Sequence, residues 1–275
     1  MKVLHLATHI NIGGITTYIS KVAPSLKQIG VETFVVSGGG ACKEDFEKHG
    51  AKTFELNIKT KNELNPKIYF ALPALEKIVC ENKIDLLHAH SRITQVMAGI
   101  LSKKMGIPVV TTCHGYFTRR LGRRIFPAWG DLTIAISQGV SDHLIRDFKL
   151  PAERVLTVNN AVDLEELDHA YVSHDLHETK KSYKIKPEEP VVGVVARLVA
   201  DKGHEYLLRA IPLVAKDFPG IHVLIVGDGR HRKYLEQLSK ELGIENRVIF
   251  TGNVRDVSKP LAAFDIFSLP ATWRE

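Results

Sequence analysis

Apolar positions along the chain repeat with two periods. Short runs rich in β-branched residues predict strands, and the stretches between them have the three- and four-residue spacing of amphipathic helices. In the first part of the chain the expected strands are Val3–Ala7, Thr33–Val36, Thr53–Leu56, Asp85–His88, Val109–Thr112, Leu132–Ala135 and Val155–Val158. The expected helices are Ile15–Ile29, Lys67–Asn82, Thr94–Met105 and Val140–Asp147. This alternation predicts an α/β domain whose doubly wound sheet is mostly parallel.

A charged stretch, Asp163–Pro190, interrupts the alternation and contains few large apolar residues. We expect residues 165–189 to connect two domains and to carry one exposed helix. A second series then follows, with strands at Val191–Val195, His222–Val226, Val248–Phe250 and Ile266–Leu269 and helices at Glu205–Lys216, His231–Leu242 and Val254–Ala263. The pattern therefore predicts a complete domain over residues 1–164 and the first half of a similar domain over residues 190–275.

The composition is that of a soluble globular protein, with 44% hydrophobic and 25% charged residues among 275. The sequence has no apolar run of membrane-spanning length, and MKVLHLATHI lacks the pattern of a signal peptide. We expect a cytoplasmic protein, with peripheral binding at the inner membrane face left open. Three widely spaced cysteines, Cys42, Cys80 and Cys113, do not form a disulfide framework.

The charge pattern narrows the class of ligand. A formal net charge of +6 suits phosphorylated ligands or an anionic membrane surface. Nucleic acid is not expected, because no helix carries a dense basic stripe and no aromatic cluster offers a stacking platform. The sequence contains neither the His and Cys spacings of a zinc site nor two aspartates two positions apart. We therefore expect no metal, so that cations and amides would balance the charge of a diphosphate.

Candidate binding residues should follow strands, because ligands of open parallel sheets bind at the carboxyl ends of the strands. Two such sheets facing each other would form a cleft. Gly13 and Gly14 follow the first strand and precede a helix, where amide groups favour an anion. An ordinary tight turn explains this pair of glycines equally well. The surrounding sequence NIGGITTY does not match the dinucleotide fingerprint G-x-G-x-x-G, which argues against a nicotinamide enzyme.

His114 ends the strand VVTTCHGY, where an imidazole can hydrogen-bond a ligand or move a proton. A loop histidine that caps the next helix remains the alternative. Four guanidinium groups follow within six positions, from Arg119, Arg120, Arg123 and Arg124. They form either a solvated basic face or a contact for a phosphate-bearing acceptor or anionic lipid.

The second domain offers two cations around one loop. Arg197 directly follows a strand, and Lys202 stands five positions later at the start of a helix. Such a pair can clamp a diphosphate without metal, although two surface cations beside a helix would look the same. Gly227, Asp228 and Gly229 end the next strand and predict a second turn that a ligand approaches closely. Ser137, by contrast, has the position of a helix N-cap.

In order and spacing, these pieces resemble family 4 glycosyltransferases, which have the GT-B fold of two Rossmann-like domains. The resemblance covers the whole chain and includes Gly13-Gly14, TTCHGY, AISQGVSDHL, VNNAVDL, GVVARLVADKGHEYLLRA, LIVGDGR and RVIFTGNVRDVSKPLAAFDIFSLPATWRE. It implies that Arg197 and Lys202 hold the donor diphosphate, that His114 lies near the transferred sugar, and that Gly14 approaches the donor phosphates. It also implies that Glu275 is the first glutamate of an E-x7-E motif, whose second glutamate the sequence lacks.

The resemblance implies transfer of a hexose from a UDP- or GDP-sugar to a hydroxyl group, with retention and without cofactor or metal. The acceptor would be lipid-linked or a saccharide, as in the synthesis of cell-envelope polysaccharide. Because the donor domain is expected to be incomplete, the 275-residue chain itself need not be active. Two alternatives remain open: a sugar-nucleotide 2-epimerase of the same architecture, and a non-catalytic donor-binding remnant.

Overall fold

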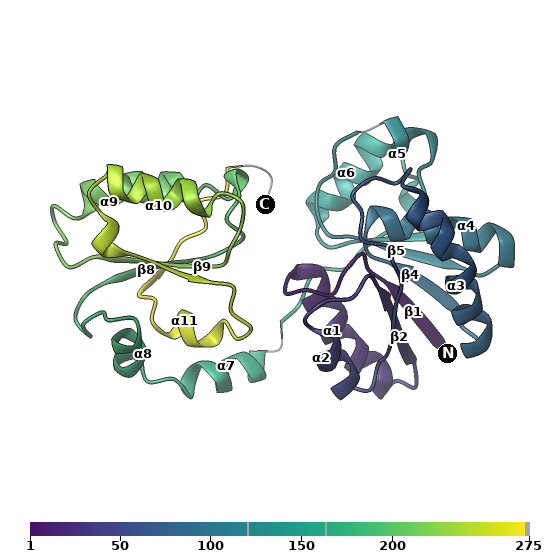
Figure 1. Cartoon of the computed structure of the whole chain (residues 1–275), viewed down its shortest axis with the longest axis horizontal. Helices are drawn as coiled ribbons and strands as arrows, with labels where there is room; N and C mark the ends of the chain where they lie inside the picture. The colour runs from purple at the N-terminus through teal and green to yellow at the C-terminus, as the bar shows by residue number, and fades with distance from the viewer. Residues whose placement is uncertain (120, 163, 273–275) are drawn as a thin grey trace. The chain divides into compact units, whose positions relative to one another are not determined.

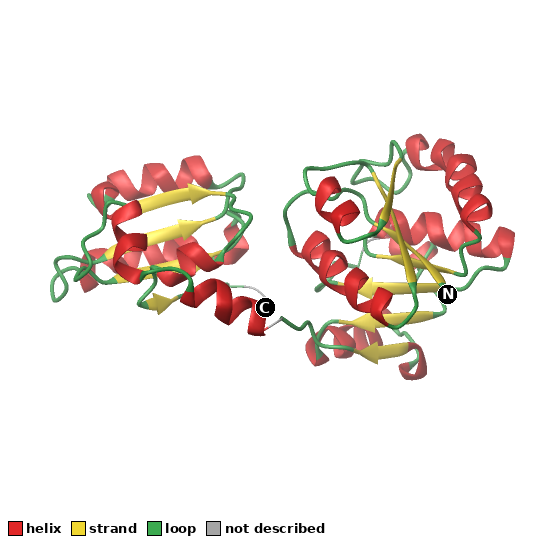
Figure 2. Ribbon diagram, turned by 90° about the horizontal axis from the view of Figure 1, so that it is seen from below, coloured by secondary structure: helices red, strands yellow, loops and turns green. Residues whose placement is uncertain are grey.

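The computed structural model describes residues 1–119, 121–162 and 164–272, and the chain divides into two compact units. Unit 1 is Met1–Asn160 and unit 2 is Ala161–Glu275. Each unit contains its own parallel sheet with helices on both faces (Figure 1, Figure 2). The alternation of strands and helices in the sequence therefore predicted the fold class correctly.

Unit 1 is built on seven strands in the order β3-β2-β1-β4-β5-β6-β7, and every pairing is parallel. Their bounds are β1 Lys2–Leu6, β2 Glu32–Ser37, β3 Lys52–Glu55, β4 Leu86–Ala89, β5 Val109–Cys113, β6 Leu132–Ala135 and β7 Val155–Thr157. The strand order reverses direction between β1 and β4. In an open sheet of this kind, such a reversal opens a crevice at the carboxyl ends of the strands.

Helices cover both faces of the unit 1 sheet. They are α1 Gly14–Gln28, α2 Lys43–Lys48, α3 Pro66–Asn82, α4 Arg92–Met105, α5 Leu121–Ile125 and α6 Gln138–Phe148, with a short 3₁₀ turn at Ala152–Arg154. Helix α4 begins at a reciprocal cap, in which Ser91 and Thr94 each bond the other's backbone amide. The side chain of Ser137 accepts from the amide of Val140, so this residue is the N-cap that its position predicted.

The two faces of the central strands have different chemistry, because successive residues of a strand point to opposite faces. Leu4, Leu6 and Leu87 pack in the apolar core beneath α3 and α4. The intervening positions carry His5 on β1 and His88 on β4, which are directly paired in the register of the two strands. This second face lies on the side of α1 (Figure 1).

Unit 2 has four parallel strands in the order β10-β9-β8-β11. They are β8 Val191–Val195, β9 His222–Val226, β10 Val248–Gly252 and β11 Ile266–Phe267. The helices are α7 Leu164–Val172, α8 Leu176–Ser182, α9 His204–Val214, α10 Arg232–Glu241 and α11 Ser258–Ala262, with 3₁₀ turns at Ala200–Lys202 and Glu245–Arg247. One core packs α9 and α10 on the sheet, and a second core lies on the face that α11 covers (Figure 1).

Residues 165–189, expected to be a connection with one exposed helix, are part of unit 2 and contain two helices, α7 and α8. Lys180 in α8 is only 2% exposed. Its Nζ donates to the carbonyl oxygens of Pro187 and Glu189 and, at 2.8 Å, to Oδ2 of Asp265. A charged residue with all three donors satisfied can be buried, so the polar composition of this segment concealed its packing. The boundary between the units lies at 160/161 rather than at 164/165.

Within the described residues, no helix has both the length and the apolar composition required to cross a membrane.

Candidate functional site

The loop from β1 to α1 leaves open space at its two glycines. Gly13 is the N-cap of α1, and among the residues with described structure no side chain caps the amide groups of the first turn. A Cβ atom at Gly13 or at Gly14 would have no neighbour within 4 Å in the structure. The first-turn amides and the positive end of the helix dipole can therefore be approached by an anion.

His114 follows β5 at the same edge of the sheet and is half-buried. Its Nε2 lies 3.1 Å from Nδ1 of His90, and the ring of Tyr18 from α1 meets its ring edge-on at a centroid distance of 5.0 Å. Burial lowers the pKa of His114 to about 4, so the imidazole is neutral at pH 7. His114 lies in the loop after β5, and its hydrogen bond joins it to His90 rather than to α5, which begins at Leu121.

Three further histidines extend from His114 into the sheet. Nδ1 of His5 lies 2.9 Å from Nε2 of His90, and Nε2 of His88 lies 2.7 Å from Oγ1 of Thr112. Burial lowers the pKa of His5 to about 4. For His88 and His90, burial and then the neighbouring imidazoles lower the pKa well below its usual value. The sequence showed His88 and His90 as a close pair, but only the strand register adds His5 to them.

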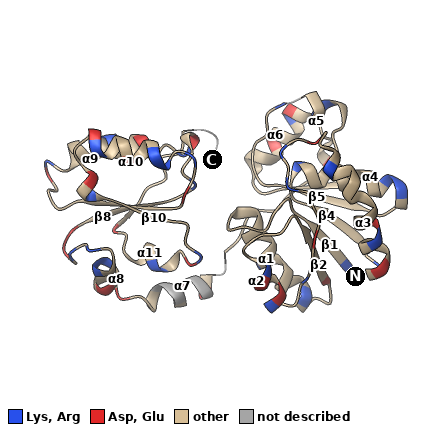
Figure 3. Ribbon diagram, viewed as in Figure 1, with Lys and Arg blue, Asp and Glu red and all other residues tan. Residues whose placement is uncertain are grey.

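Arg123 differs from the other arginines of its segment. Arg119 is paired with Asp147 at 3.3 Å and remains largely exposed, Arg124 is exposed, and Arg120 lies outside the described residues. The side chain of Arg123, in contrast, is buried and stacks on aromatic rings of unit 1. The expectation that Arg123 meets an acceptor or a membrane is therefore wrong. Lys and Arg elsewhere are spread over both units among Asp and Glu (Figure 3).

In unit 2 the two expected cations stand at the carboxyl edge of the sheet, after β8. Arg197 is exposed, while the next residue, Leu198, is fully buried and anchors the loop. Lys202 is half-buried in the 3₁₀ turn that precedes α9. The pKa of Lys202 is lowered, mainly by burial and in part by the positive charge of Arg197, although Asp201 opposes the shift. The two cations are therefore close enough to repel each other.

The turn after β9 is held against the loop that carries Arg197. The amide of Leu198 donates to the carbonyl oxygen of Asp228 at 3.0 Å. A Cβ atom at Gly227 would lie 2.1 Å from the carbonyl oxygen of Ala196, and one at Gly229 would lie 2.3 Å from that of Leu198. The carboxylate of Asp228 accepts from the amide of Gly229 and pairs with Arg232 at 3.3 Å. Packing of one loop on another thus accounts for both glycines.

The segment after β11 joins the same edge. A Cβ atom at Gly203 would lie 1.8 Å from the carbonyl oxygen of Pro270, and φ at Gly203 is +68°, so glycine is required here. The amide of Thr272 donates to the carbonyl oxygen of Asp201 at 3.0 Å. Glu275, the expected first glutamate of the family motif, lies outside the described residues three positions further along.

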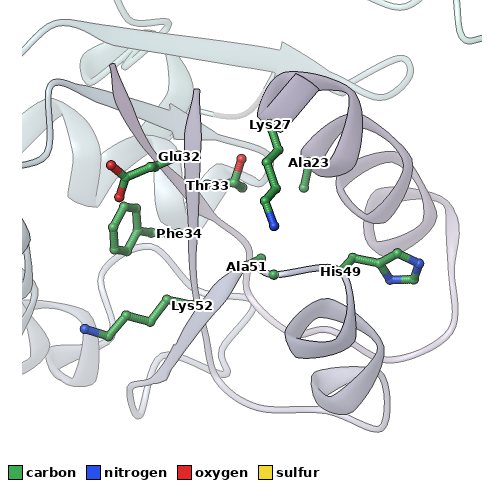
Figure 4. A pocket seen from close by; sticks show the side chains of 9 residues that line it. Ala23, Lys27, Glu32, Thr33, Phe34, His49, Ala51 and Lys52 are labelled. Carbon is green, nitrogen blue, oxygen red and sulfur yellow. The ribbon is translucent and has the colours of Figure 1, made fainter. Parts of the chain in front are cut away.

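A cavity of about 180 Å³ lies at the opposite edge of the unit 1 sheet (Figure 4). It is lined by residues from the end of α1, the start of β2 and the start of β3, and Lys27 and Thr33 point into it. None of the candidate residues that the structure describes lines it. The candidate site is therefore defined by the strand ends and not by this cavity.

Residues 12–166 match the family model described as Glycosyltransferase Family 4, and residues 175–275 match the model described as Glycosyl transferases group 1. The Escherichia coli UDP-Gal:alpha-D-GlcNAc-diphosphoundecaprenol alpha-1,3-galactosyltransferase is 25% identical over 252 residues, which are 84% of this chain and 65% of that protein. Among four of the curated relatives, the chain spans between 52% and 72% of the relative's length.

The fold also matches solved structures. Anabaena Alr3699/HepE in complex with UDP-glucose has a TM-score of 0.80 at 23% identity, covering 98% of this chain and 74% of that one. UDP-GlcNAc 2-epimerase from Neisseria meningitidis, bound to UDP-GlcNAc, has a TM-score of 0.67 at 15% identity, covering 97% of this chain and 77% of that one. At such identities the likeness shows a shared GT-B architecture and not a shared reaction. The family model, which covers more than half of the 275 residues, is the stronger finding: the chain belongs to glycosyltransferase family 4.

Proposed function

We propose that the protein transfers a hexose from a nucleotide-diphosphate sugar to a hydroxyl acceptor, with retention of the anomeric configuration and without a metal ion. Membership of glycosyltransferase family 4 supports transfer from a nucleotide sugar. The observation that carries the residue assignment is the pair of cations at the sheet edge of unit 2. Arg197 and Lys202 are the groups that we assign to the donor diphosphate.

The mutual repulsion of these two cations favours an anionic ligand. Burial is the main reason that the pKa of Lys202 is lowered; the carboxylate of Asp201 opposes this shift, and the positive charge of Arg197 adds to it. An anion bound to both cations would remove the contribution of Arg197. A guanidinium can bind a phosphate through two parallel hydrogen bonds, and an ammonium adds a point charge. Contacts that strengthen as the diphosphate leaves lower the barrier by a few kcal/mol each. We add the backbone turn at Gly227, Asp228 and Gly229 as a support for this loop and as a candidate donor contact.

The proposed chemical step requires no carboxylate nucleophile. The bond between the anomeric carbon and the β-phosphate oxygen breaks, and the acceptor oxygen bonds to the anomeric carbon on the same face. The proton of the acceptor hydroxyl passes to an oxygen of the leaving diphosphate. We assign His114 to the transferred sugar as a neutral hydrogen-bonding group, and the open amides at Gly13 and Gly14 to oxygen atoms of the donor. Glu275 stays a predicted contact of the donor sugar.

The test replaces each cation in the protein together with any sequence that continues past Glu275. Arg197→Ala and Lys202→Ala should each lower kcat/KM at least about 100-fold, which corresponds to about 2.7 kcal/mol of transition-state stabilisation. Lys216→Ala, an exposed cation two residues beyond the end of α9, is the matched control and should stay within about twofold. Near-normal rates in the first two variants would remove the diphosphate clamp from the proposal.

The same assay without acceptor separates transfer from 2-epimerisation. A transferase leaves the donor unchanged apart from slow hydrolysis, whereas an epimerase produces the C2 epimer of the nucleotide sugar. A third outcome, in which UDP or GDP binds in calorimetry but no sugar moves under any condition, would favour a donor-binding protein without catalytic activity.

We propose further that the acceptor is lipid-linked or a saccharide and that Arg119 and Arg124 help to hold it or an anionic membrane. Both guanidinium groups are exposed, beside Leu121 and Ile125, which are 70% and 73% exposed. Exposed cations beside exposed apolar side chains suit the surface of an anionic bilayer. Vesicles of phosphatidylglycerol should co-sediment the protein, and the double variant Arg119→Glu/Arg124→Glu should abolish this. Equal binding to phosphatidylcholine vesicles would contradict the proposal.

A further inference from the structure

We propose that His5 and His90 are positioning residues that fix the proton of His114 on Nδ1, through a chain of hydrogen bonds between three neutral imidazoles. The role of His114 at the sugar rests on the proposed function, whereas its tautomer does not. The chain would present His114 to a ligand as a hydrogen-bond donor of constant orientation.

The strand register places these rings in line. His5 lies on β1, His90 directly follows β4, and His114 directly follows β5. Nδ1 of His5 lies 2.9 Å from Nε2 of His90, and Nδ1 of His90 lies 3.1 Å from Nε2 of His114. Both distances are those of a hydrogen bond. Each pair of nitrogens must therefore share one proton.

A neutral imidazole has one N–H donor and one acceptor nitrogen, so the two bonds cannot be oriented independently. His90 uses both ring nitrogens, one in each bond. If it accepts from His5, it must donate to His114, and if it donates to His5, it must accept from His114. The whole chain therefore has two arrangements, and the proton on His5 decides which one is present.

The far end of the chain selects between these arrangements. Nε2 of His5 is completely buried and has no hydrogen-bond partner among the described residues. A proton on this atom would be a buried N–H without an acceptor, which is rare in proteins. The favoured arrangement therefore leaves the proton on Nδ1 of His5. His5 then donates to His90, His90 donates to His114, and the remaining nitrogen of His114, Nδ1, carries its proton.

Burial keeps the chain neutral. His5 and His90 are 0% and 3% exposed, and burial lowers the pKa of each ring. An added proton would turn an acceptor nitrogen into a donor and break one of the two bonds. Tyr18 packs against the rings of His90 and His114, with centroid distances of 5.6 Å and 5.0 Å, and holds them in place.

A metal ion is the competing interpretation of the same rings. His5, His88 and His90 offer ring nitrogens that lie within 4.8 Å of one another. Histidine ligands usually donate their second nitrogen to a carboxylate, a backbone carbonyl or water. Here the hydrogen-bond partners are the hydroxyl of Thr112 and other imidazoles, and no described carboxylate offsets a buried dication. These contacts favour the proton chain.

Long-range ¹H–¹⁵N correlation spectra of the ¹⁵N-histidine-labelled chain at pH 7.5, without ligand, report each ring's tautomer directly. The proposal expects His5, His90 and His114 all in the Nδ1–H form. In His90→Phe, which removes the N–H that donates to Nε2 of His114, we expect the Nε2–H form of His114 to appear. His88→Phe is the matched control. His88 is also buried in this cluster, but its ring hydrogen-bonds Thr112 and is not part of the chain of hydrogen bonds.

Several outcomes would overturn the proposal. They are a protonated His114, an Nε2–H form of any of the three rings in the unmodified protein, an unchanged tautomer of His114 in His90→Phe, and a changed one in His88→Phe. Stoichiometric binding of Zn²⁺ that both Phe variants abolish would replace the proton chain with a metal centre. The spectrum of the unmodified protein alone decides which tautomer is present, so the proposal stays testable if a variant fails to fold. The spectra are recorded without a sugar donor. If Arg197→Ala and Lys202→Ala left transfer unchanged, the proposed function would fail, but the spectra would still decide the tautomer of His114.

Discussion

The burial of Arg123 makes a prediction that separates it from its neighbours. The guanidinium carbon lies 4.3 Å from the ring centroid of Phe117 and 4.5 Å from that of Trp129. Its Nη1 donates to Oε1 of Gln95 at 3.2 Å. We expect Arg123→Ala to destabilise unit 1, whereas Arg124→Ala, which truncates an exposed side chain of the same helix, should not.

The magnitude follows from these contacts. Stacking of a desolvated guanidinium on an aromatic ring contributes up to about 2 kcal/mol, and a hydrogen bond to a charged group contributes about 1.5–3 kcal/mol. The cost of burying the charge opposes both, and the same burial lowers the pKa of Arg123 to about 10. Gln95, only 1% exposed, would also lose its partner. The net loss should be about 2–4 kcal/mol for Arg123→Ala and within about 0.5 kcal/mol for Arg124→Ala.

Trp129 serves as the reporter. The sequence has two tryptophans, so a Trp273→Phe background leaves Trp129 as the only one, inside the contact under test. Urea unfolding followed by its fluorescence gives the free energy of unfolding of unit 1, apart from that of unit 2. Equal midpoints for the two alanine variants would refute the assignment of Arg123 to the core. Arg123 would then rejoin Arg119 and Arg124 as a candidate contact for the acceptor.

Three further predictions concern His5, Gly229 and Gly14. Burial lowers the pKa of His5 to about 4, against about 6.5 when unfolded, so the unfolded state binds more protons between these values. Unit 1 should therefore hold full stability above about pH 7 and lose up to about 3 kcal/mol through His5 as the pH falls to 4. Urea midpoints should show a shallower pH dependence in His5→Phe, and an equal slope would contradict this. Gly229→Ala should destabilise unit 2 by about 1–3 kcal/mol, because its Cβ would lie 2.3 Å from the carbonyl oxygen of Leu198. Gly14→Ala should leave stability within about 0.5 kcal/mol but weaken donor binding in calorimetry, and unchanged binding would remove Gly14 from the site.

The alternation of apolar runs was enough to predict the strands, since both sheets are parallel and mostly buried on two faces. It failed where an element buries almost nothing apolar. Helix α2, Lys43–Lys48, buries only Phe46, and α5, Leu121–Ile125, buries only Arg123. A six-residue helix with one buried position has no readable period, and a buried cation gives the opposite signal to an apolar one. The same reason explains why the sequence predicts a connection with one exposed helix over residues 165–189, where α8 has Lys180 at its buried face.

The candidate site was predictable to the extent that it depends on strand ends. Arg197 and His114 were found because they directly follow apolar runs, and parallel strands place such residues at one edge. His5 was missed because it stands inside VLHLA, where nothing distinguishes it from a core position. Its significance depends on its contact with His90, which is 85 residues away, and register between strands so far apart in the sequence is a tertiary property.

The glycines show how far position alone can be taken. Gly13-Gly14 and the Gly227–Gly229 turn follow a strand in the same way, and both were expected to admit a donor. The structure gives a different reason for glycine at each of these two sites. At Gly227 and Gly229 the space of a side chain is filled by the neighbouring loop, so the fold itself needs glycine. At Gly13 and Gly14 no atom of the described residues lies within 4 Å of that space, and neither φ lies in the left-handed region. Because the fold does not explain the glycines at positions 13 and 14, a ligand that approaches the backbone there is the better explanation. In unit 2, by contrast, the donor assignment must rest on Arg197 and Lys202 and not on the glycines beside them.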